Sequence, residues 1–216
     1  MPRCELHDLQ AAYRRHFRLT HRTSREQLTW PVPGRVWAAD HAQPPSPVDG
    51  RDPALLSVRD LASGLELAWL PVPDETAATT AQVLATLFAR HGPPLVLKSD
   101  NGSAFKSRTL QALLEAHRIV ALRSPPRTPR YNGSSEAGIG SLKKRTRHFA
   151  ARQRRLGTWT RQDLEAARRQ GNELTRPQGH RGPTPAERWA DRSPIRDQER
   201  DQLASAILRH RTQIMN

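Results

Sequence analysis

The 216-residue chain contains one cysteine, few aromatic residues and no long hydrophobic run. A single cysteine, Cys4, excludes a framework of disulfides and a cysteine-rich zinc module. The first ten residues lack the apolar core of a signal peptide, and no segment approaches the roughly 18 apolar residues of a membrane span. We therefore expect a cytoplasmic protein without a membrane partner.

Acidic residues are also scarce relative to basic ones. There are 35 Lys and Arg against 21 Asp and Glu, which gives a formal net charge of +14. A charge of this sign and size favours a polyanionic partner over the substrates of an acidic metabolic enzyme. Only 36% of the residues are hydrophobic, but they are regularly patterned, so we expect a folded chain of one or at most two domains.

The hydrophobic pattern predicts a five-stranded mixed sheet flanked by helices, in the α/β class. Three apolar runs separated by turns predict an antiparallel meander, and two further strands alternate with helices that allow parallel crossovers. The predicted strands are 35–40, 54–60, 65–72, 95–100 and 119–122. The predicted helices are 5–17, 75–90 with Asp74 as cap, one marked by Leu110 to His117, 134–154, 160–175, a short one within 180–189, and 197–214.

We divide the chain into three parts. Residues 1–34 form an N-terminal helix and basic arm, which either lies on nucleic acid or is a solvated linker. Residues 35–190 form the core, and residues 191–216 form a C-terminal helical tail. The apolar face of that tail either packs on its own domain, which we favour, or contacts a partner. Cys4 and the histidines of the arm are too dispersed for a compact metal site.

Three acidic residues stand where folding would bring them together. Asp40 ends the first strand and Asp100 the fourth, so both carboxylates leave the same edge of the sheet if these strands are parallel neighbours. Glu136 lies in the first turn of the helix after the proline-rich segment 123–133, with 35 residues between it and Asp100. Carboxylates suit Mg²⁺ or Mn²⁺, and two such ions activate a hydroxyl and stabilise the oxygen that leaves a phosphodiester.

Each of these acids also has a structural interpretation. The sequence Asp100-Asn101-Gly102 favours a turn, and the helix dipole favours an acid in a first helical turn. A structural role is the better interpretation of any one acid alone, whereas a metal site better explains the three together in so basic a protein. Asp60, at the end of the second strand, is a weaker fourth candidate, with turn capping as its alternative.

Three short motifs resemble the catalytic core of retroviral integrases and insertion-sequence transposases. They are Trp-Ala-Ala-Asp at 37–40, Lys-Ser-Asp-Asn-Gly-Ser-Ala-Phe at 98–105 and Pro-Arg-Tyr-Asn-Gly-Ser-Ser-Glu at 129–136. That superfamily is called DDE for its Asp, Asp, Glu triad, and the 35-residue gap found here before the Glu is its usual spacing. The segments 137–146 and 172–189 are similar to bacterial members.

This resemblance implies a ribonuclease H-like fold and a catalytic and metal site of Asp40, Asp100 and Glu136. It implies Mg²⁺ or Mn²⁺ as cofactor, two ions with DNA bound. The implied activity is that of a Mg-dependent DNA transposase, which nicks transposon-end DNA to expose a 3′-OH and joins it to target DNA by transesterification. The implied partners are double-stranded DNA and at least a second copy of the chain, so we expect the protein to be associated with the nucleoid.

Two positions depart from the family pattern. Relatives often have Thr or Ser two residues after the first Asp, where this chain has His41-Ala42, and bulky or polar residues after the Glu, where it has Ala137, Gly138 and Gly140. A glycine inside a helix costs about 1 kcal/mol. We therefore expect a close approach of backbone to DNA or to a neighbouring helix. His41 is placed to serve the site, although a polar residue at a strand end is the favoured interpretation.

A basic stretch surrounds Glu136. Between residues 123 and 155 there are ten Lys and Arg and one acid, so we expect phosphate contacts from the loop and from one face of the following helix. Tyr131 either stacks on an unpaired base or packs as a hydrophobic staple at the helix start. The predicted DNA-binding residues are Arg127, Arg130, Tyr131, Asn132, Lys143, Lys144 and Arg147.

Two other functions are consistent with the sequence. The first is a truncated or domesticated DNA-binding remnant without strand-transfer activity, because 34 residues before the core are too few for the helix-turn-helix that recognises transposon ends. The second is a nuclease on the same fold. Ribonuclease H enzymes commonly carry another carboxylate on the first long helix, and this chain offers only Glu75 at the extreme start, which argues against a nuclease.

Overall fold

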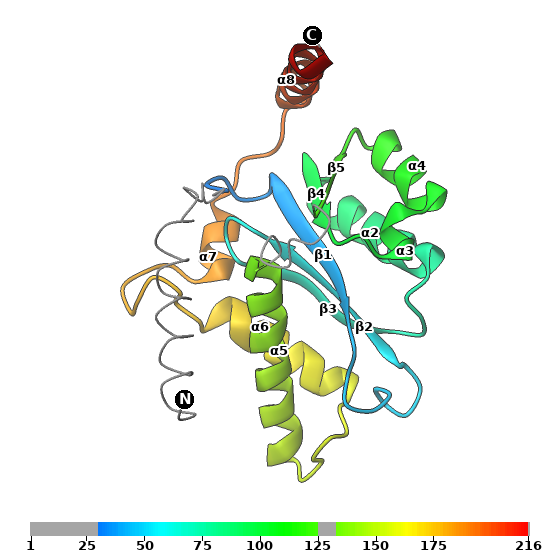
Figure 1. Cartoon of the computed structure of the whole chain (residues 1–216). Helices are drawn as coiled ribbons and strands as arrows, with labels where there is room; N and C mark the ends of the chain where they lie inside the picture. Colours follow the sequence, from blue (N-terminus) through cyan, green and yellow to red (C-terminus); the bar gives the residue numbers. More distant parts are fainter. Residues whose placement is uncertain (1–29, 125–132, 216) are drawn as a thin grey trace, which may run out of the picture.

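The computed structural model describes residues 30–124 and 133–215, and its centre is a five-stranded sheet (Figure 1). The strands are β1 (Val36–Ala42), β2 (Ala54–Asp60), β3 (Glu66–Val72), β4 (Val96–Ser99) and β5 (Val120–Arg123). They lie in the order β3-β2-β1-β4-β5. β1, β2 and β3 form an antiparallel meander, while β4 is parallel to both β1 and β5. The predicted mixed sheet is therefore confirmed.

Helices cover both faces of this sheet (Figure 1). On one face, α2 (Ala77–His91), α3 (Ser103–Lys106) and α4 (Arg108–Ala116) pack over the strands. On the other face, α5 (Gly133–Arg152) and α6 (Arg161–Glu173) do the same. The chain then forms the short α7 (Pro185–Ala190) and the C-terminal α8 (Asp197–Met215).

Covering both faces explains why the strands are almost continuously apolar. Trp37 and Leu56 belong to the hydrophobic cluster beneath α2 and α4, whereas Leu55 and Trp69 belong to the cluster beneath α5 and α6. Successive side chains of a strand point to opposite faces, so a strand buried on both faces needs apolar residues at nearly every position. The core is consequently divided by the sheet into two layers.

Two local predictions were wrong in detail. Asp74 does not cap α2, because the helix begins later and Thr76 is its N-cap, accepting from the Thr79 N–H at 3.3 Å. Asp74 instead accepts hydrogen bonds from the hydroxyls of Thr76 and Thr79. The helix predicted around Leu110 is preceded by the separate α3, since Ser107 is extended and caps α4 by accepting from the Leu110 N–H.

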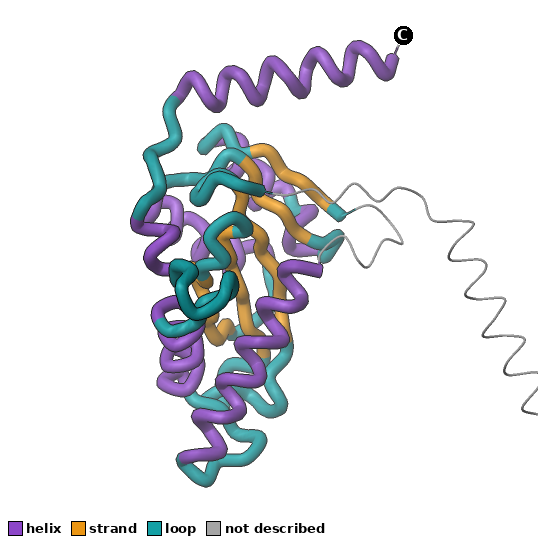
Figure 2. Tube along the Cα trace, turned by 90° about the vertical axis from the view of Figure 1, so that its left-hand side faces the viewer, coloured by secondary structure: helices purple, strands orange, loops and turns teal. Residues whose placement is uncertain are grey.

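The tail helix α8 projects away from the core (Figure 2). Its first turn is attached: Arg200 donates to the Pro94 carbonyl at 2.9 Å, and Glu199 forms an ion pair with Arg35 at 2.9 Å. Its other described side chains, as far as residue 210, are exposed or half-buried. The favoured interpretation of a tail packed on its own domain holds for its start, where Arg118 also forms an ion pair with Asp201, and is not borne out by the exposed side chains that follow.

Several predictions concern residues 1–29, which lie outside the described residues. They include the helix at 5–17, most of the basic arm, and Cys4 with its neighbouring histidines. The three domain boundaries stay predictions. Within the two described ranges, no helix has the length and apolar composition that a membrane span needs.

Candidate active site

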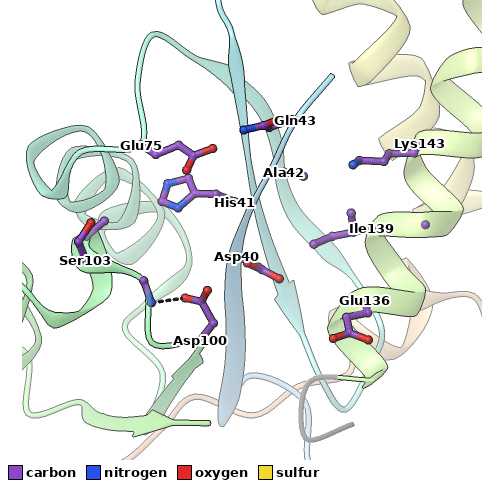
Figure 3. Close-up of a pocket in the computed structure, with 13 residues that line it drawn as sticks. Asp40, His41, Ala42, Gln43, Glu75, Asp100, Ser103, Glu136, Ile139 and Lys143 are labelled. Atoms are coloured by element: carbon purple, nitrogen blue, oxygen red, sulfur yellow. Dashed lines mark hydrogen bonds between the residues drawn. The ribbon is translucent and has the colours of Figure 1, made fainter. Parts of the chain in front are cut away.

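Asp40 and Asp100 lie at one edge of the sheet because β1 and β4 are parallel neighbours. The register pairs Ala39 with Ser99, so each aspartate comes directly after a paired position. Glu136 reaches the same edge from the first turn of α5. All three acids line one cavity of about 650 Å³, the carboxylate cavity, in which Asp40 lies between the other two (Figure 3). The structure thus brings the three predicted acids together.

Asp100 shapes a tight turn and lines the carboxylate cavity as well. Its Oδ1 accepts from the Gly102 N–H at 2.9 Å (Figure 3), and Asn101 donates from Nδ2 to the Ser124 carbonyl at 2.7 Å. A Cβ on Gly102 would lie 3.0 Å from Asp100 Oδ1, so a glycine suits the turn at this position. Both interpretations of Asp100-Asn101-Gly102 apply, since the turn orients the carboxylate that lines the cavity.

Asp40 has acids for its charged neighbours. Burial raises the pKa of Asp40 to about 6, and the negative charges of Asp100, Glu136 and Glu75 add to the rise, while the His41 N–H opposes it. Like charges at short range disfavour ionisation of one another. The carboxylate cavity therefore carries a negative potential that a bound cation would neutralise.

The chemistry of the donors fits a hard divalent cation, because carboxylate oxygens from three elements face one cavity. In the described part of the chain, however, no three His, Cys, Asp or Glu side chains lie close enough together to hold an ion. Mg²⁺ is commonly bound by one or two carboxylates together with waters and substrate phosphates. Asp40, Asp100 and Glu136 are the residues that would hold it.

Glu75 and His41 also line the carboxylate cavity (Figure 3). The His41 ring lies 5.2 Å from the Phe105 ring and its Nε2 is 3.2 Å from Thr80 Oγ1, so it packs as well as lining the cavity. Burial lowers the pKa of His41. The sequence analysis gave Glu75 no part in the site. The antiparallel hairpins β1–β2 and β2–β3 bring the end of β3 to the sheet edge that holds Asp40. This topology is the signal that could have placed Glu75 near the cavity.

Asp60 lies outside this cavity and is fully buried. It accepts hydrogen bonds from the Gly34 N–H at 2.8 Å, the Ser63 N–H at 2.7 Å and the Ser63 hydroxyl at 2.6 Å. All of these donors belong to the turns that flank β1 and β2. Of the two interpretations of Asp60, the structure therefore supports turn capping and not the weaker candidacy as a fourth metal-binding carboxylate.

The two interior glycines of α5, Gly138 and Gly140, meet different surroundings. A Cβ on Gly138 would lie 2.6 Å from Arg59 Nη1 and 3.0 Å from Glu66 Oε1, so the helix approaches a buried ion pair. A Cβ on Gly140 would have nothing within 4 Å, and Gly140 lines the carboxylate cavity. The expected close approach is found at Gly138, where strand side chains take the place of the expected DNA or helix.

The predicted DNA-binding residues fall into two groups. Lys143 lines the carboxylate cavity, and a neighbouring cavity is lined by Lys143, Lys144 and Arg147 together. The structure therefore places the three α5 cations beside the acids. The other four predicted residues lie outside the described residues, and their roles stay predictions: Arg127, Arg130, Tyr131 and Asn132.

Comparison with known proteins shows which family this arrangement of acids resembles. Residues 31–129 match the family model described as the integrase core domain, a segment that includes Asp40 and Asp100. This segment therefore resembles an integrase core. It is also 31% identical over 115 residues to the uncharacterized protein K02A2.6 of Caenorhabditis elegans, an alignment that covers 53% of this chain and 9% of that protein. The chain thus spans a small part of this curated relative.

Solved integrases share the fold of this core. The catalytic core of bovine immunodeficiency virus integrase is 25% identical, with a TM-score of 0.58 over 73% of this chain and 95% of that one. The HTLV-2 integrase catalytic core in complex with magnesium is 20% identical, with a TM-score of 0.58 over 72% and 96%. A simian T-cell lymphotropic virus intasome chain is 20% identical, with a TM-score of 0.66 over 80% of this chain and 63% of that one.

These likenesses confirm the predicted ribonuclease H-like fold. Together with the match over residues 31–129, they support the predicted family of integrase and transposase catalytic cores, which are polynucleotidyl transferases.

Proposed function

We propose that this integrase core belongs to a DNA transposase, which nicks the end of a mobile DNA element and joins the freed 3′-OH to target DNA. One observation carries the proposal: Asp40, Asp100 and Glu136 come from three separate elements and line a single cavity. The integrase core over residues 31–129 and the cations of α5 support it. The substrate in this proposal is double-stranded DNA, both as element end and as target.

The acids of the carboxylate cavity are proposed to hold Mg²⁺ or Mn²⁺, with two ions present when DNA is bound. Bound there, the ions would supply activation of the attacking hydroxyl and stabilisation of the leaving oxygen. The similar HTLV-2 integrase core is in complex with magnesium, which supports this assignment. The negative potential at Asp40 supports it as well.

The proposed chemistry consists of two successive attacks on phosphorus. In the first, a water oxygen attacks the scissile phosphate, the bond from phosphorus to the 3′ oxygen breaks, and a 3′-OH is released. In the second, that 3′ oxygen attacks a phosphate of target DNA and loses its proton, while the displaced target 3′ oxygen gains one. One phosphodiester bond forms as another breaks, and no covalent bond between protein and DNA is needed.

The protein's own residues would act by holding these groups in place. β1 is the central strand and is paired on both sides, by β2 and β4, so Asp40 comes from a strand that its neighbours hold in place. The Gly102 N–H orients the Asp100 carboxylate. Lys143, at the boundary of the carboxylate cavity, offers a positive charge for a phosphate. Held groups of this kind reduce the entropy lost in reaching the transition state.

Assembly of two or more copies is part of the proposal, because joining requires element ends and target DNA to be held together. The similar solved structures include dimeric and trimeric forms of the HTLV-2 integrase core and an intasome. We infer at least a homodimer for this chain.

A nuclease that cuts without joining is a second candidate, favoured by Glu75. This fourth carboxylate lines the cavity and contributes to the high pKa of Asp40. Additional carboxylates near a metal site are compatible with simple hydrolysis. The products distinguish the two functions, because only the transposase yields joined strands.

The test is incubation of the protein with labelled short duplexes and supercoiled plasmid in Mg²⁺, Mn²⁺ or EDTA. We expect nicks and joined products with either metal ion and none with EDTA. Asp40→Asn is expected to lower both yields about a hundredfold or more while DNA retention stays within about twofold. Asp191→Asn, an exposed position at the end of α7, is the matched control and should react like the wild type.

Three results would contradict the proposal in different ways. Nicks without joined strands indicate the nuclease. Salt-sensitive DNA binding without any cleavage indicates the DNA-binding remnant. Joining by Asp40→Asn in the presence of metal ion would show that the acids of the cavity do not carry the reaction.

A further inference from the structure

The first turns of α5 lie between two cavities. One helix face lines the carboxylate cavity with Glu136, Ile139, Gly140 and Lys143. The opposite face lines a separate cavity of about 280 Å³, here called the support cavity, with Ser134, Ala137, Gly138 and Ser141. The start of the helix therefore borders a cavity on each side, and its position depends on a small number of contacts.

The Glu136 carboxylate depends on this helix start for its position. Glu136 is exposed, and within the described residues no hydrogen bond or ion pair holds its side chain. The helix start is attached to the sheet by Ile139 and Leu142, which pack in the hydrophobic cluster beneath α5. It also meets the sheet at Gly138, which contacts Arg59. Because a helix is stiff over one turn, a shift at Gly138 also moves Glu136, about 3 Å along the axis.

The Arg59 guanidinium occupies the space between two glycines of different elements. A Cβ on Gly138 would lie 2.6 Å from Arg59 Nη1, and a Cβ on Gly64, in the turn after β2, would lie 3.0 Å from Nη2. Nη1 also donates to the carboxylate of Glu66, which is buried on β3. A guanidinium is planar and presents its N–H groups in a fixed fork, so this pairing fixes its orientation. The ion pair thereby holds a rigid group against the start of α5.

We propose that Arg59 is a positioning residue for Glu136. Its guanidinium, paired with Glu66, sets how closely α5 approaches the sheet at Gly138, and this approach sets where Glu136 lies in the carboxylate cavity. Arg59 lines the support cavity and not the carboxylate cavity, so it acts through the helix and not by contact with DNA or metal ion. The inference rests on the proposed function, in which Glu136 helps to hold the ions.

Two single variants and their combination test the contact between Arg59 and Gly138. Gly138→Ala places a methyl group against the guanidinium and should displace the helix start. Arg59→Lys keeps the charge beside Glu66 but replaces the fork by a single ammonium, so the helix loses its support at Gly138. In the double variant Arg59→Lys, Gly138→Ala the added methyl group takes the place of Nη1, and the wild-type position should return.

The matched control is Gly133→Ala, the same substitution at the first residue of α5. Gly133 lines neither the carboxylate cavity nor the support cavity, and its Cβ would meet nothing within 4 Å. Any effect of an added methyl group on the propensity of the helix is therefore present in the control, while the contact with Arg59 is unchanged.

Hydrogen exchange measures the support of the helix start in the absence of metal ion and DNA. In EDTA, the amides of residues 133–142 should exchange about tenfold faster in Gly138→Ala and in Arg59→Lys than in Gly133→Ala, with the exchange of α2 unchanged. A difference confined to one helix reports local opening, whereas a general loss of stability would raise exchange throughout the protein. The double variant should exchange like the control.

Bound Mn²⁺ measures the consequence for Glu136. Electron paramagnetic resonance follows a Mn²⁺ titration of the protein on a duplex that ends in a 3′ dideoxynucleotide, which has no 3′-OH to join. We expect the half-saturating Mn²⁺ concentration to rise about tenfold in Gly138→Ala, Arg59→Lys and Glu136→Gln, in line with the loss seen when a residue that orients a metal ligand is changed. The control and the double variant should stay within about twofold of the wild type.

The proposal is overturned if Gly138→Ala keeps the wild-type exchange rates and Mn²⁺ affinity, or if the double variant is no closer to the wild type than the single variants. A wild type that binds no Mn²⁺ contradicts the metal assignment of the proposed function, and the exchange rates then decide alone whether Arg59 supports the helix start. Mn²⁺ binding that follows the expected order without any strand joining contradicts the transposase function and leaves this inference in place.

Discussion

Two acidic side chains near α5 meet opposite surroundings. Glu66, on β3, is buried beneath the helix and accepts a hydrogen bond from the Arg59 guanidinium. Burial raises the pKa of Glu66, and the charge and hydrogen bond of Arg59 oppose that rise. Asp40 is partly buried too, but its charged neighbours Asp100 and Glu136 raise its pKa further. One acid has a cation as neighbour, and the other has acids.

This difference separates acids that serve the fold from acids that serve the site. The other buried acids of the described residues each accept a hydrogen bond from a cation or an N–H: Asp52, Asp60 and Asp163. Grouped like charges lower stability, and strongly shifted pKa values of this kind concentrate at functional sites. The unpartnered acids of the carboxylate cavity therefore mark it as a candidate functional site.

The largest change in stability is expected when the cation is removed from the Arg59–Glu66 pair. Arg59→Met leaves the Glu66 carboxylate buried without its partner, so we expect a loss of about 3–5 kcal/mol in the free energy of unfolding. Urea denaturation followed by circular dichroism measures it. The double variant Arg59→Met, Glu66→Leu removes both charges and should recover most of the loss. A loss below about 1 kcal/mol in the single variant would show that the pair does not hold this interior.

The two interior glycines of α5 extend the contrast between the buried pair and the cavity to the backbone. Gly138→Ala should destabilise the fold, because its Cβ meets the buried Arg59–Glu66 pair and overpacking outweighs the gain in helix propensity. Gly140→Ala is the matched control, since it gains propensity in open space. We expect the two variants to differ by about 2 kcal/mol in unfolding free energy. Equal stabilities would mean that Gly138 is not needed for the close approach.

Removing the charge of Asp40 should change the free energy of unfolding by a smaller amount, and in the stabilising direction. The pKa of Asp40 is raised from 3.8 to about 6 on folding, so the folded protein loses stability as pH rises through this window. Asp40→Asn removes that loss and should stabilise the ion-free protein at pH 7 by about 1 kcal/mol, allowing for screening at a partly exposed group. Thermal unfolding in EDTA at several pH values measures this.

The control for this effect lies within the same titration. Below pH 4 both proteins carry a neutral group at position 40, so their stabilities should converge. A stabilisation by Asp40→Asn that persists unchanged at low pH would point to packing as its cause, and charge repulsion in the cavity would then be the wrong explanation.

The hydrophobic pattern of the sequence was enough to predict the strands, and the positions of Asp40, Asp100 and Glu136 in the predicted elements were enough to predict that they share one site. β2 spans the predicted residues 54–60, and hairpin and crossover rules were enough to predict a mixed sheet with Asp40 and Asp100 at one edge. Turn capping by Asp60 was among its sequence interpretations, but its donors could not be named from the sequence, because Gly34 and Ser63 lie on two different turns. The place of Glu75 was missed because its position follows from the two antiparallel hairpins taken together, and the residues around Glu75 do not show it.

The sequence by itself determined the elements, the fold class and the three acids at one sheet edge, because periodicity and chain reversal depend on residues close in the chain. Only the tertiary structure decided which acids are partnered and which are not. Arg59 and Gly138 are 79 positions apart in the chain, and Ser46 and Gly157 are 111 positions apart. Such pairs meet only when the layers pack. Burial and charge pairing are set at those meetings, so they are properties of the folded chain.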